Sequence, residues 1–162
     1  MTDMVLTGAS PQTTEKLLGD WVAHTKATDI LDDLTPEQAV SKLEGWPYSI
    51  AEQVAHLLFW QRYTHQQIET GKPPEVPSAA MGWPTVTASD WPRARDEFLQ
   101  AVEKSREIAR NPDTLERKCG KDYTIGVALL RDISHHSYHL GQIAFMRRLL
   151  GLWPPPSGGD TW

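Results

Sequence analysis

Apolar residues recur at helical spacing in two stretches in the first half of the chain. The first stretch covers residues 10–35 and opens with a Ser-Pro pair, which is typical of an N-cap followed by a first-turn proline. The second covers residues 49–70, where Ser49 and Glu52 fit a capping box. These patterns predict two helices. Residues 35–48, with two prolines and a glycine, predict a connection that includes a short helical turn.

The second half of the chain predicts two more helices after a long loop. Residues 71–88 contain four prolines, which neither a helix nor a central strand accommodates, so a loop is expected there. A helix over residues 89–110 follows and stops at the Asn-Pro-Asp run of residues 111–113. The longest apolar periodicity then covers residues 123–150 and ends at a glycine, which predicts the fourth helix.

Four amphipathic helices without a convincing strand pattern indicate an all-α protein, because each apolar stripe must be covered by another helix. We expect a four-helix bundle made of a single domain, residues 1–162, with a tail rich in proline and tryptophan at 151–162. The loop at 71–88 is long enough to run the length of a helix. An up-down-down-up topology with a crossover between helices two and three is therefore expected, and it makes the second helix antiparallel to the fourth.

Composition and charge narrow the classes of partner. The formal charge is −5, and no basic cluster extends beyond Arg147 and Arg148, so neither nucleic acid nor an anionic membrane is expected as a partner. The first ten residues lack a signal-peptide pattern and no apolar run could span a bilayer, which favours a cytoplasmic protein. Cys119 is the only cysteine, so neither a disulfide nor a Cys-x-x-Cys metal site is expected.

Three histidines lie within five residues of the predicted fourth helix. His135 and His139 are four residues apart, so they project from one helix face with Cβ atoms about 5–6 Å apart and can hold one metal ion. His136 lies about 100° round the helix and is expected to pack against a neighbouring helix or to be half exposed. Because the second helix runs antiparallel to the fourth, His56 is the best candidate for a third ligand.

Three neutral imidazoles leave at least one position on an ion open for water or substrate. They suit zinc or nickel, with iron or manganese as alternatives. The motif lacks both the glutamate of His-Glu-x-x-His proteases and the paired Glu-x-x-His of di-iron bundles, so a single ion is expected. Glu52 lies one turn before His56 and is a candidate catalytic base, although its place in the capping box explains it equally well. His24 and His65 are expected at the surface.

A mixed polar and aromatic stripe on the second helix, which includes His56 and Trp60, suggests a wet pocket. The side chains that we expect to line a substrate pocket are Trp46, Trp60, Gln142 and Trp153. The tail at 151–162 is stiffened by three prolines, and we expect it to fold back near Trp46 and His56 with Trp153 or Trp162 buried in the pocket wall. The alternative is an arm that docks onto a second subunit.

Three segments carry a family resemblance: IAEQVAHL at 50–57, YHLGQI at 138–143 and WPPP at 153–156. Together they resemble the DinB/YfiT-like superfamily. The resemblance covers nearly the whole chain and implies a four-helix bundle with a long crossover. It also implies a mononuclear metal site made by three histidines, which map onto His56, His135 and His139.

Similar proteins include thiol S-transferases that use glutathione, mycothiol or bacillithiol, a thiol-dependent isomerase and metal-dependent hydrolases, often as dimers. The resemblance thus implies a homodimeric metal-dependent enzyme that acts on a small molecule, with a low-molecular-weight thiol as cosubstrate. We favour a thiol-dependent S-transferase, in which the metal lowers the pKa of the bound thiol. The alternatives are a metal-dependent hydrolase, a non-catalytic stress-related protein that binds metal or a small ligand, and a purely structural bundle.

Overall fold

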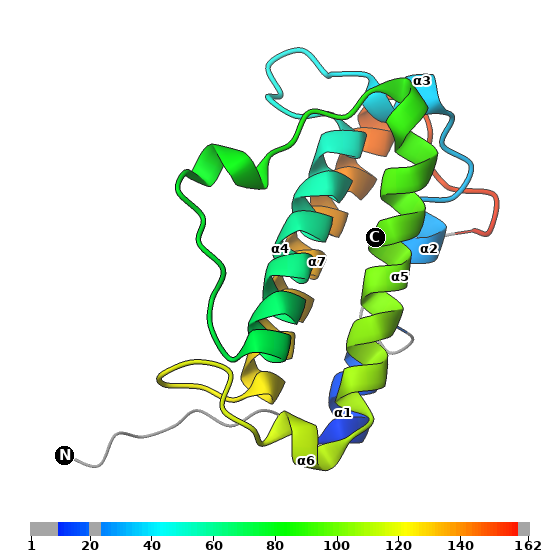
Figure 1. Ribbon diagram of the computed structural model, residues 1–162. Coiled ribbons are helices and arrows are strands. Elements are labelled where there is room, and N and C mark those ends of the chain that lie inside the picture. Colours follow the sequence, from blue (N-terminus) through cyan, green and yellow to red (C-terminus); the bar gives the residue numbers. More distant parts are fainter. Residues whose placement is uncertain (1–9, 20–23, 159–162) are drawn as a thin grey trace.

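The computed structural model describes residues 10–19 and 24–158, and this part of the chain confirms the all-α class (Figure 1). Pairing of extended backbone within it is limited to one isolated bridge, between Lys118 and Thr124. No helix in these ranges has the length and apolar composition to cross a lipid bilayer. The elements in chain order are α1 (Pro11–Leu17), α2 (Ala27–Ile30), α3 (Pro36–Val40), α4 (Ile50–Thr70), η1 (Ala79–Gly82), η2 (Ala88–Asp90), α5 (Trp91–Ala109), α6 (Pro112–Leu115) and α7 (Ile125–Leu149).

The long helices α4 and α7 run antiparallel along the centre of the molecule (Figure 1). Gln53, near the start of α4, donates a hydrogen bond to the sulfur of Met146 near the end of α7. Thr64, farther along α4, donates to Asp132 near the start of α7. As the residue numbers increase along α4, those of the partners on α7 decrease, which is the pattern of an antiparallel pair.

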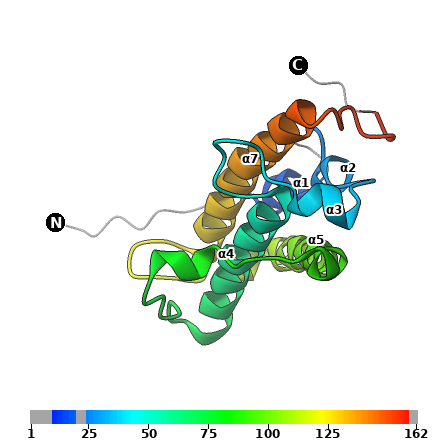
Figure 2. The same cartoon turned by 90° about the horizontal axis from the view of Figure 1, so that it is seen from above.

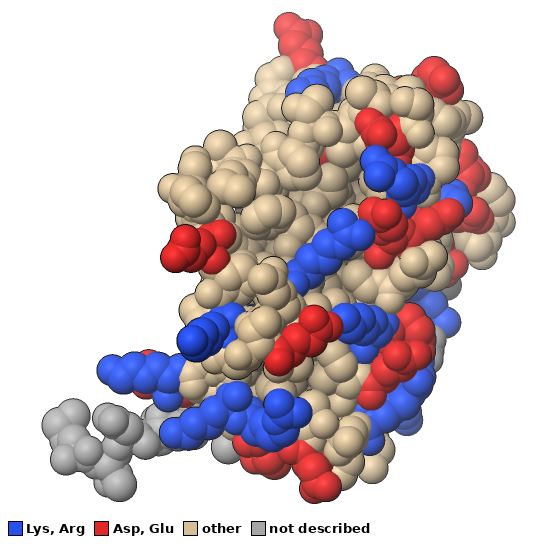
Figure 3. All heavy atoms as spheres, viewed as in Figure 1, with Lys and Arg blue, Asp and Glu red and all other residues tan. Residues whose placement is uncertain are grey.

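The third long helix, α5, lies beside α4 (Figure 2) and runs in the same direction (Figure 1). Two ion pairs join their surfaces, Arg62 with Glu97 at 3.1 Å and Glu69 with Lys104 at 2.6 Å. Both pairs join residues that are 35 apart in the chain, as a parallel pair of helices requires. Basic and acidic side chains are interspersed along α5 on the face that Figure 3 shows.

The crossover between α4 and α5 contains more local structure than the predicted loop. It forms two 3-10 turns, η1 and η2, and passes along α4 before it joins α5 (Figure 1). The helix expected over residues 89–110 begins at Trp91, because Thr87 and Asp90 close a capping box around η2 just before it. The crossover is therefore partly ordered by its own hydrogen bonds.

The prediction of a single helix over residues 10–35 is wrong. α1 ends at Leu17, and residues 24–26 are not helical before α2 begins. The two parts bury their apolar side chains in different places, since Leu18 belongs to one core cluster and Ile30 and Leu31 to another. A straight helix cannot serve both. The stretch 10–35 also includes Trp21 and Val22, which lie outside the described residues.

The other predicted boundaries are closer. Helices were expected over residues 49–70 and 123–150, and α4 and α7 occupy those positions with Ser49 and Thr124 as their N-caps. Residues 111–113 do end α5, but Asn111 then caps the additional short helix α6. After α7, Gly151 adopts a left-handed conformation with φ of 71°, which a side chain would disfavour.

The buried apolar residues of the described chain form two clusters. The main cluster joins α2, α3, the first half of α4, α5 and the second half of α7, and includes Leu57, Trp91, Phe98, Leu140 and Ile143. The second lies toward the opposite ends of these helices and includes Leu18, Ile68, Leu115, Ile125 and Leu129. Between the two clusters, the long helices bury polar side chains, which form a layer made by Gln61, Thr64, His65, Ser105, Asp132, His136 and His139.

Arg147 ties the end of α7 to the turn after α2. Its side chain is 1% exposed and donates to the carbonyl oxygens of Ile30, Asp32 and Leu152, and it pairs with the Asp33 carboxylate at 2.6 Å. The guanidinium group thus supplies donors to three backbone oxygens and one carboxylate at the ends of α2 and α7. The hydrogen bond to Leu152 also fastens the beginning of the tail.

We expect Arg147→Met to lower the free energy of unfolding by about 3 kcal/mol, because it leaves buried acceptors without a donor. Denaturant titration followed by circular dichroism measures this change. Arg148→Met is the matched control. Its guanidinium is exposed and lies over the Trp153 ring at 5.3 Å, so its loss should cost less than about 1 kcal/mol. Equal losses in the two variants would contradict the role assigned to Arg147.

Candidate metal centre

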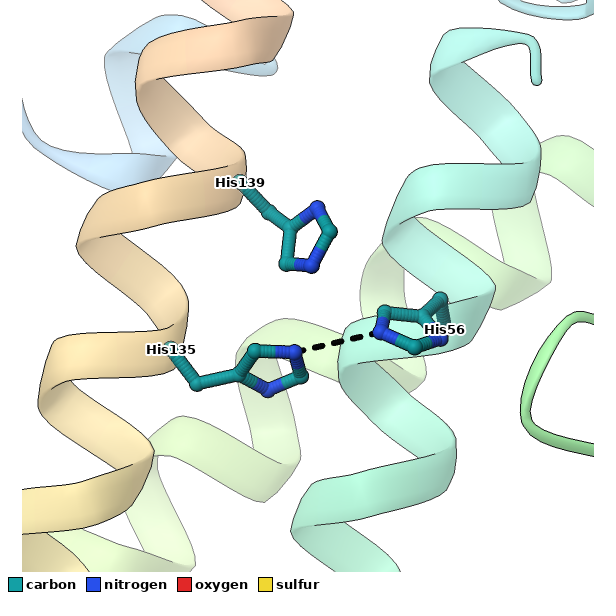
Figure 4. Close-up of side chains that lie close together, drawn as sticks. All are labelled: His56, His135 and His139. Carbon is teal, nitrogen blue, oxygen red and sulfur yellow. Dashed lines mark hydrogen bonds between the residues drawn. The ribbon is translucent and has the colours of Figure 1, made fainter. Parts of the chain in front are cut away.

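His56 on α4 and His135 and His139 on α7 point toward one another across the seam between the two helices (Figure 4). Each offers one ring nitrogen, and these three atoms all lie within 4.8 Å of one another. The Nε2 atoms of His56 and His135 are 3.1 Å apart. Two nitrogens bound to one tetrahedral ion at about 2.1 Å lie roughly 3.4 Å apart, so little movement separates this arrangement from a ligand set.

Two hydrogen bonds fix which nitrogen of each ring faces the centre. His56 donates from Nδ1 to the carbonyl oxygen of Gly82 at 2.5 Å, and His139 donates from Nδ1 to Oε1 of Gln53 at 3.0 Å. Both acceptors are oxygens that cannot donate, so the proton of each neutral ring must sit on Nδ1. The Nε2 lone pairs of both rings are then free for a metal, as in histidine sites supported by an outer layer of acceptors.

The histidines are held neutral by their surroundings. Burial lowers the pKa of both His135 and His139 to about 4, and the neighbouring histidines act in the same direction. Burial also lowers the pKa of His56, against the smaller opposing effect of its hydrogen bond to Gly82. A neutral imidazole is the form that binds metal, so all three rings are ready as ligands near pH 7.

The crossover supplies a wall of the site that sequence reasoning missed. The Trp83 ring stacks on the His56 ring with centroids 3.7 Å apart, and Tyr48 stacks on Trp83 at 3.6 Å. At Gly82 a Cβ atom would lie 3.0 Å from Nε1 of Trp60, so a larger residue would push the crossover away from α4. Gly82 and Trp83 therefore position His56 from outside the helix that carries it.

Glu52 has the structural role that its capping-box position indicated. Its carboxylate accepts from the backbone N–H of Ser49 at 2.9 Å and pairs with Lys42 at 3.0 Å. Burial raises the pKa of this carboxyl group, but the hydrogen bonds from Ser49 and the charge of Lys42 outweigh it and the pKa lies below its usual value. These contacts occupy the carboxylate at the start of α4. Its proposed catalytic role stays a prediction.

The four residues expected in the pocket lie in different environments. Trp60 lines a cavity that His135 also lines, and Gln142 lies near enough to His139 to raise its pKa slightly against the larger effect of burial. Trp46 is half-buried against the main apolar cluster. Trp153 packs on the same cluster and lines a separate cavity with Ile30 and Phe145, so the tail begins by docking on the end of the fold beside α2. Trp162 lies outside the described residues.

The remaining histidines correct one expectation. His65 is buried rather than at the surface, and its Nε2 lies 2.8 Å from the hydroxyl oxygen of Ser105 on α5. His24 is half-buried and its Nε2 lies 3.2 Å from the Ser137 hydroxyl oxygen. His136 is buried and meets Phe98 edge to face, as expected for a histidine packed against a neighbouring helix.

A cavity of about 670 Å³ opens beside His135 between α4 and α7. Asp132, one turn before His135, lines this cavity and is 7% exposed. Its Oδ1 accepts a hydrogen bond from Thr64 at 2.9 Å, whereas its Oδ2 has no hydrogen-bond partner in the part of the chain that the structure describes. Burial raises the pKa of Asp132 to about 7, although the Thr64 hydrogen bond and the charge of Arg131 oppose the shift.

The pH dependence of stability tests whether the fold holds the buried His136 in its neutral form. Burial lowers its pKa to about 3, so below its usual pKa of 6.5 the unfolded chain binds a proton that the folded chain does not. The contribution of the neutral, buried His136 to the free energy of unfolding is therefore fully present above pH 6.5 and is lost as the pH falls toward about 3. Between pH 7.5 and 5.5 this one group should remove about 1.4 kcal/mol from the free energy of unfolding.

Denaturant titrations of chelator-treated protein at the two pH values measure the loss. We expect His136→Leu to lose about 1.4 kcal/mol less than the wild type, because the other histidines titrate alike in both proteins. An equal loss in the two proteins would show that His136 is not held neutral by the fold.

Comparison with known proteins adds an independent result. A search of curated proteins and a search of solved structures gave no match. The family model for the DinB superfamily matches residues 22–143, a range that includes all three converging histidines. The match covers well over half of the chain, and the resemblance inferred from the sequence motifs is confirmed. The chain belongs to the DinB superfamily.

Proposed function

We propose that this protein is a mononuclear metal-dependent enzyme in which His56, His135 and His139 bind one divalent cation. The observation that carries the proposal is the convergence of three neutral rings, two of them oriented by Gly82 and Gln53. Three nitrogen donors suit zinc or nickel, with iron or manganese as alternatives. When bound, such an ion lowers the pKa of a thiol or water in its open position, so that a nucleophile forms near neutral pH.

The activity that we favour is thiol-dependent S-transfer with a low-molecular-weight thiol as cosubstrate. The cavity beside His135 has the size of a small-molecule site, and its aromatic lining suits an apolar acceptor substrate. His135 lies at its wall, so a molecule held there is close to the proposed ion. The fold that we propose for this enzyme is a four-helix bundle with up-down-down-up topology, in which the two separate helices α1 and α2 take the place of the first helix.

Metal content and turnover of one pair of variants test the function. Protein purified without an affinity tag should hold close to one ion per chain by elemental analysis, and the metal-loaded form should consume thiol in an electrophile screen. His139→Leu should lose both the metal and the turnover, because only two of the three proposed ligands remain. His136→Leu, one helix face away, should keep both.

Each other outcome of this test has a distinct meaning. Retention of metal by His139→Leu would refute the ligand assignment. Metal binding without thiol consumption but with ester hydrolysis would replace the transferase by a hydrolase. Metal binding with neither activity would indicate a binding protein.

Gln53 gives a second test, because it touches His139 but is not a proposed ligand. Gln53→Met keeps an apolar contact to Met146 but removes the acceptor for Nδ1 of His139. We expect metal affinity to fall about 10–100-fold in a competition titration with a chromophoric chelator. Gln66→Met, at an exposed position of the same helix, should bind metal as the wild type does. Unchanged affinity in Gln53→Met would show that His139 needs no orienting partner.

A further inference from the structure

Asp132 differs from the other buried polar residues between α4 and α7, because part of its hydrogen-bonding capacity is unused. The side chain is held by Thr64 through Oδ1, and Oδ2 is buried without a partner among the described residues. A buried carboxyl oxygen without a donor is unfavourable, and such groups in folded proteins usually have a partner. Asp132 lines the cavity beside His135, so a ligand in that cavity could provide the donor.

Aromatic rings surround the same cavity. Its lining includes Trp60, Tyr63, Tyr123, Tyr138, Arg131 and Asp132. Ring faces together with a buried carboxylate are the groups that recognise an organic cation, because the ring quadrupole and the carboxylate both attract positive charge. Apolar ring area also favours a flat hydrocarbon portion of the ligand.

One cation of the protein also lines the cavity. Arg131 is exposed, and its guanidinium lies over the Tyr123 ring with its central carbon 5.4 Å from the centroid. Tyr123 is itself held by a hydrogen bond from Gln67 at 3.0 Å, so this stack is anchored to α4. Arg131 therefore has its own aromatic partner and does not supply the missing donor to Asp132.

We propose that the cavity beside His135 binds a small aromatic or apolar molecule that carries a protonated amine, with the amine donating a hydrogen bond to Asp132. The carboxyl group presents its free oxygen to the cavity by rotation about its terminal torsion, which is soft in aspartate. The inference rests on the proposed function only where it makes this molecule the acceptor substrate of the metal-dependent reaction. Binding of the amine itself requires the cavity and Asp132 alone.

Benzylamine and benzyl alcohol are matched probes, since they share a ring and differ in the charge of the donor group. Calorimetric titration of metal-loaded wild-type protein should show benzylamine binding at least about tenfold more tightly than benzyl alcohol. The same preference should persist after chelation, which separates recognition by Asp132 from coordination to the metal. Equal affinity for the two probes in chelated wild-type protein would overturn the proposal without any variant.

Three substitutions locate the charge that is responsible. Asp132→Asn keeps an acceptor for Thr64 and should abolish the preference for the amine. Asp122→Asn removes an exposed carboxylate from the preceding loop and should leave the preference intact. Arg131→Gln should strengthen amine binding, because it removes a like charge.

The outcomes of these variants separate the two proposals. A preference that survives in Asp132→Asn, or that disappears equally in Asp122→Asn, would overturn the amine site. If the untreated protein binds no metal ion but still shows the expected amine preference, the proposed enzyme is refuted and the amine site stands.

Discussion

The arrangement of this protein depends on the polar seam between α4 and α7. Gln53 meets His139, His56 meets His135, and Thr64 meets Asp132, each through side chains that are buried or partly buried. A shift of one helix by a single residue would leave these groups without their partners, at a cost of about 1–3 kcal/mol for each buried group. The contacts that fix the register of the two helices therefore also fix the geometry of the histidine site.

The seam contributes less to stability than to specificity. A satisfied hydrogen bond contributes only about 0.5–1.5 kcal/mol net, because the unfolded chain bonds equally well to water. The apolar clusters on either side must supply most of the stabilising burial, and they also shield the layer from solvent. Burial, together with the neighbouring histidines, keeps His135 and His139 neutral. The packing around the site therefore sets the protonation state of its ligands.

Sequence reasoning recovered what is encoded locally and missed what depends on distant partners. The spacing of His135 and His139 and the capping box at Ser49 are read within one or two helical turns, and the antiparallel pairing then selected His56. His65 was misplaced at the surface because its partner Ser105 lies 40 residues away on α5. The break between α1 and α2 was missed for a similar reason. The spacing of apolar residues predicts a helix but does not indicate which of the two core clusters each side chain packs in.

Gly82 makes the crossover part of the site. Nδ1 of His56 has its acceptor outside α4 and α7, in the carbonyl oxygen of Gly82 at the end of η1. The parallel direction of α4 and α5 requires a connection that returns along the molecule, and this connection brings the end of η1 to His56. The topology that demands a long loop thereby also supplies the group that orients the first ligand.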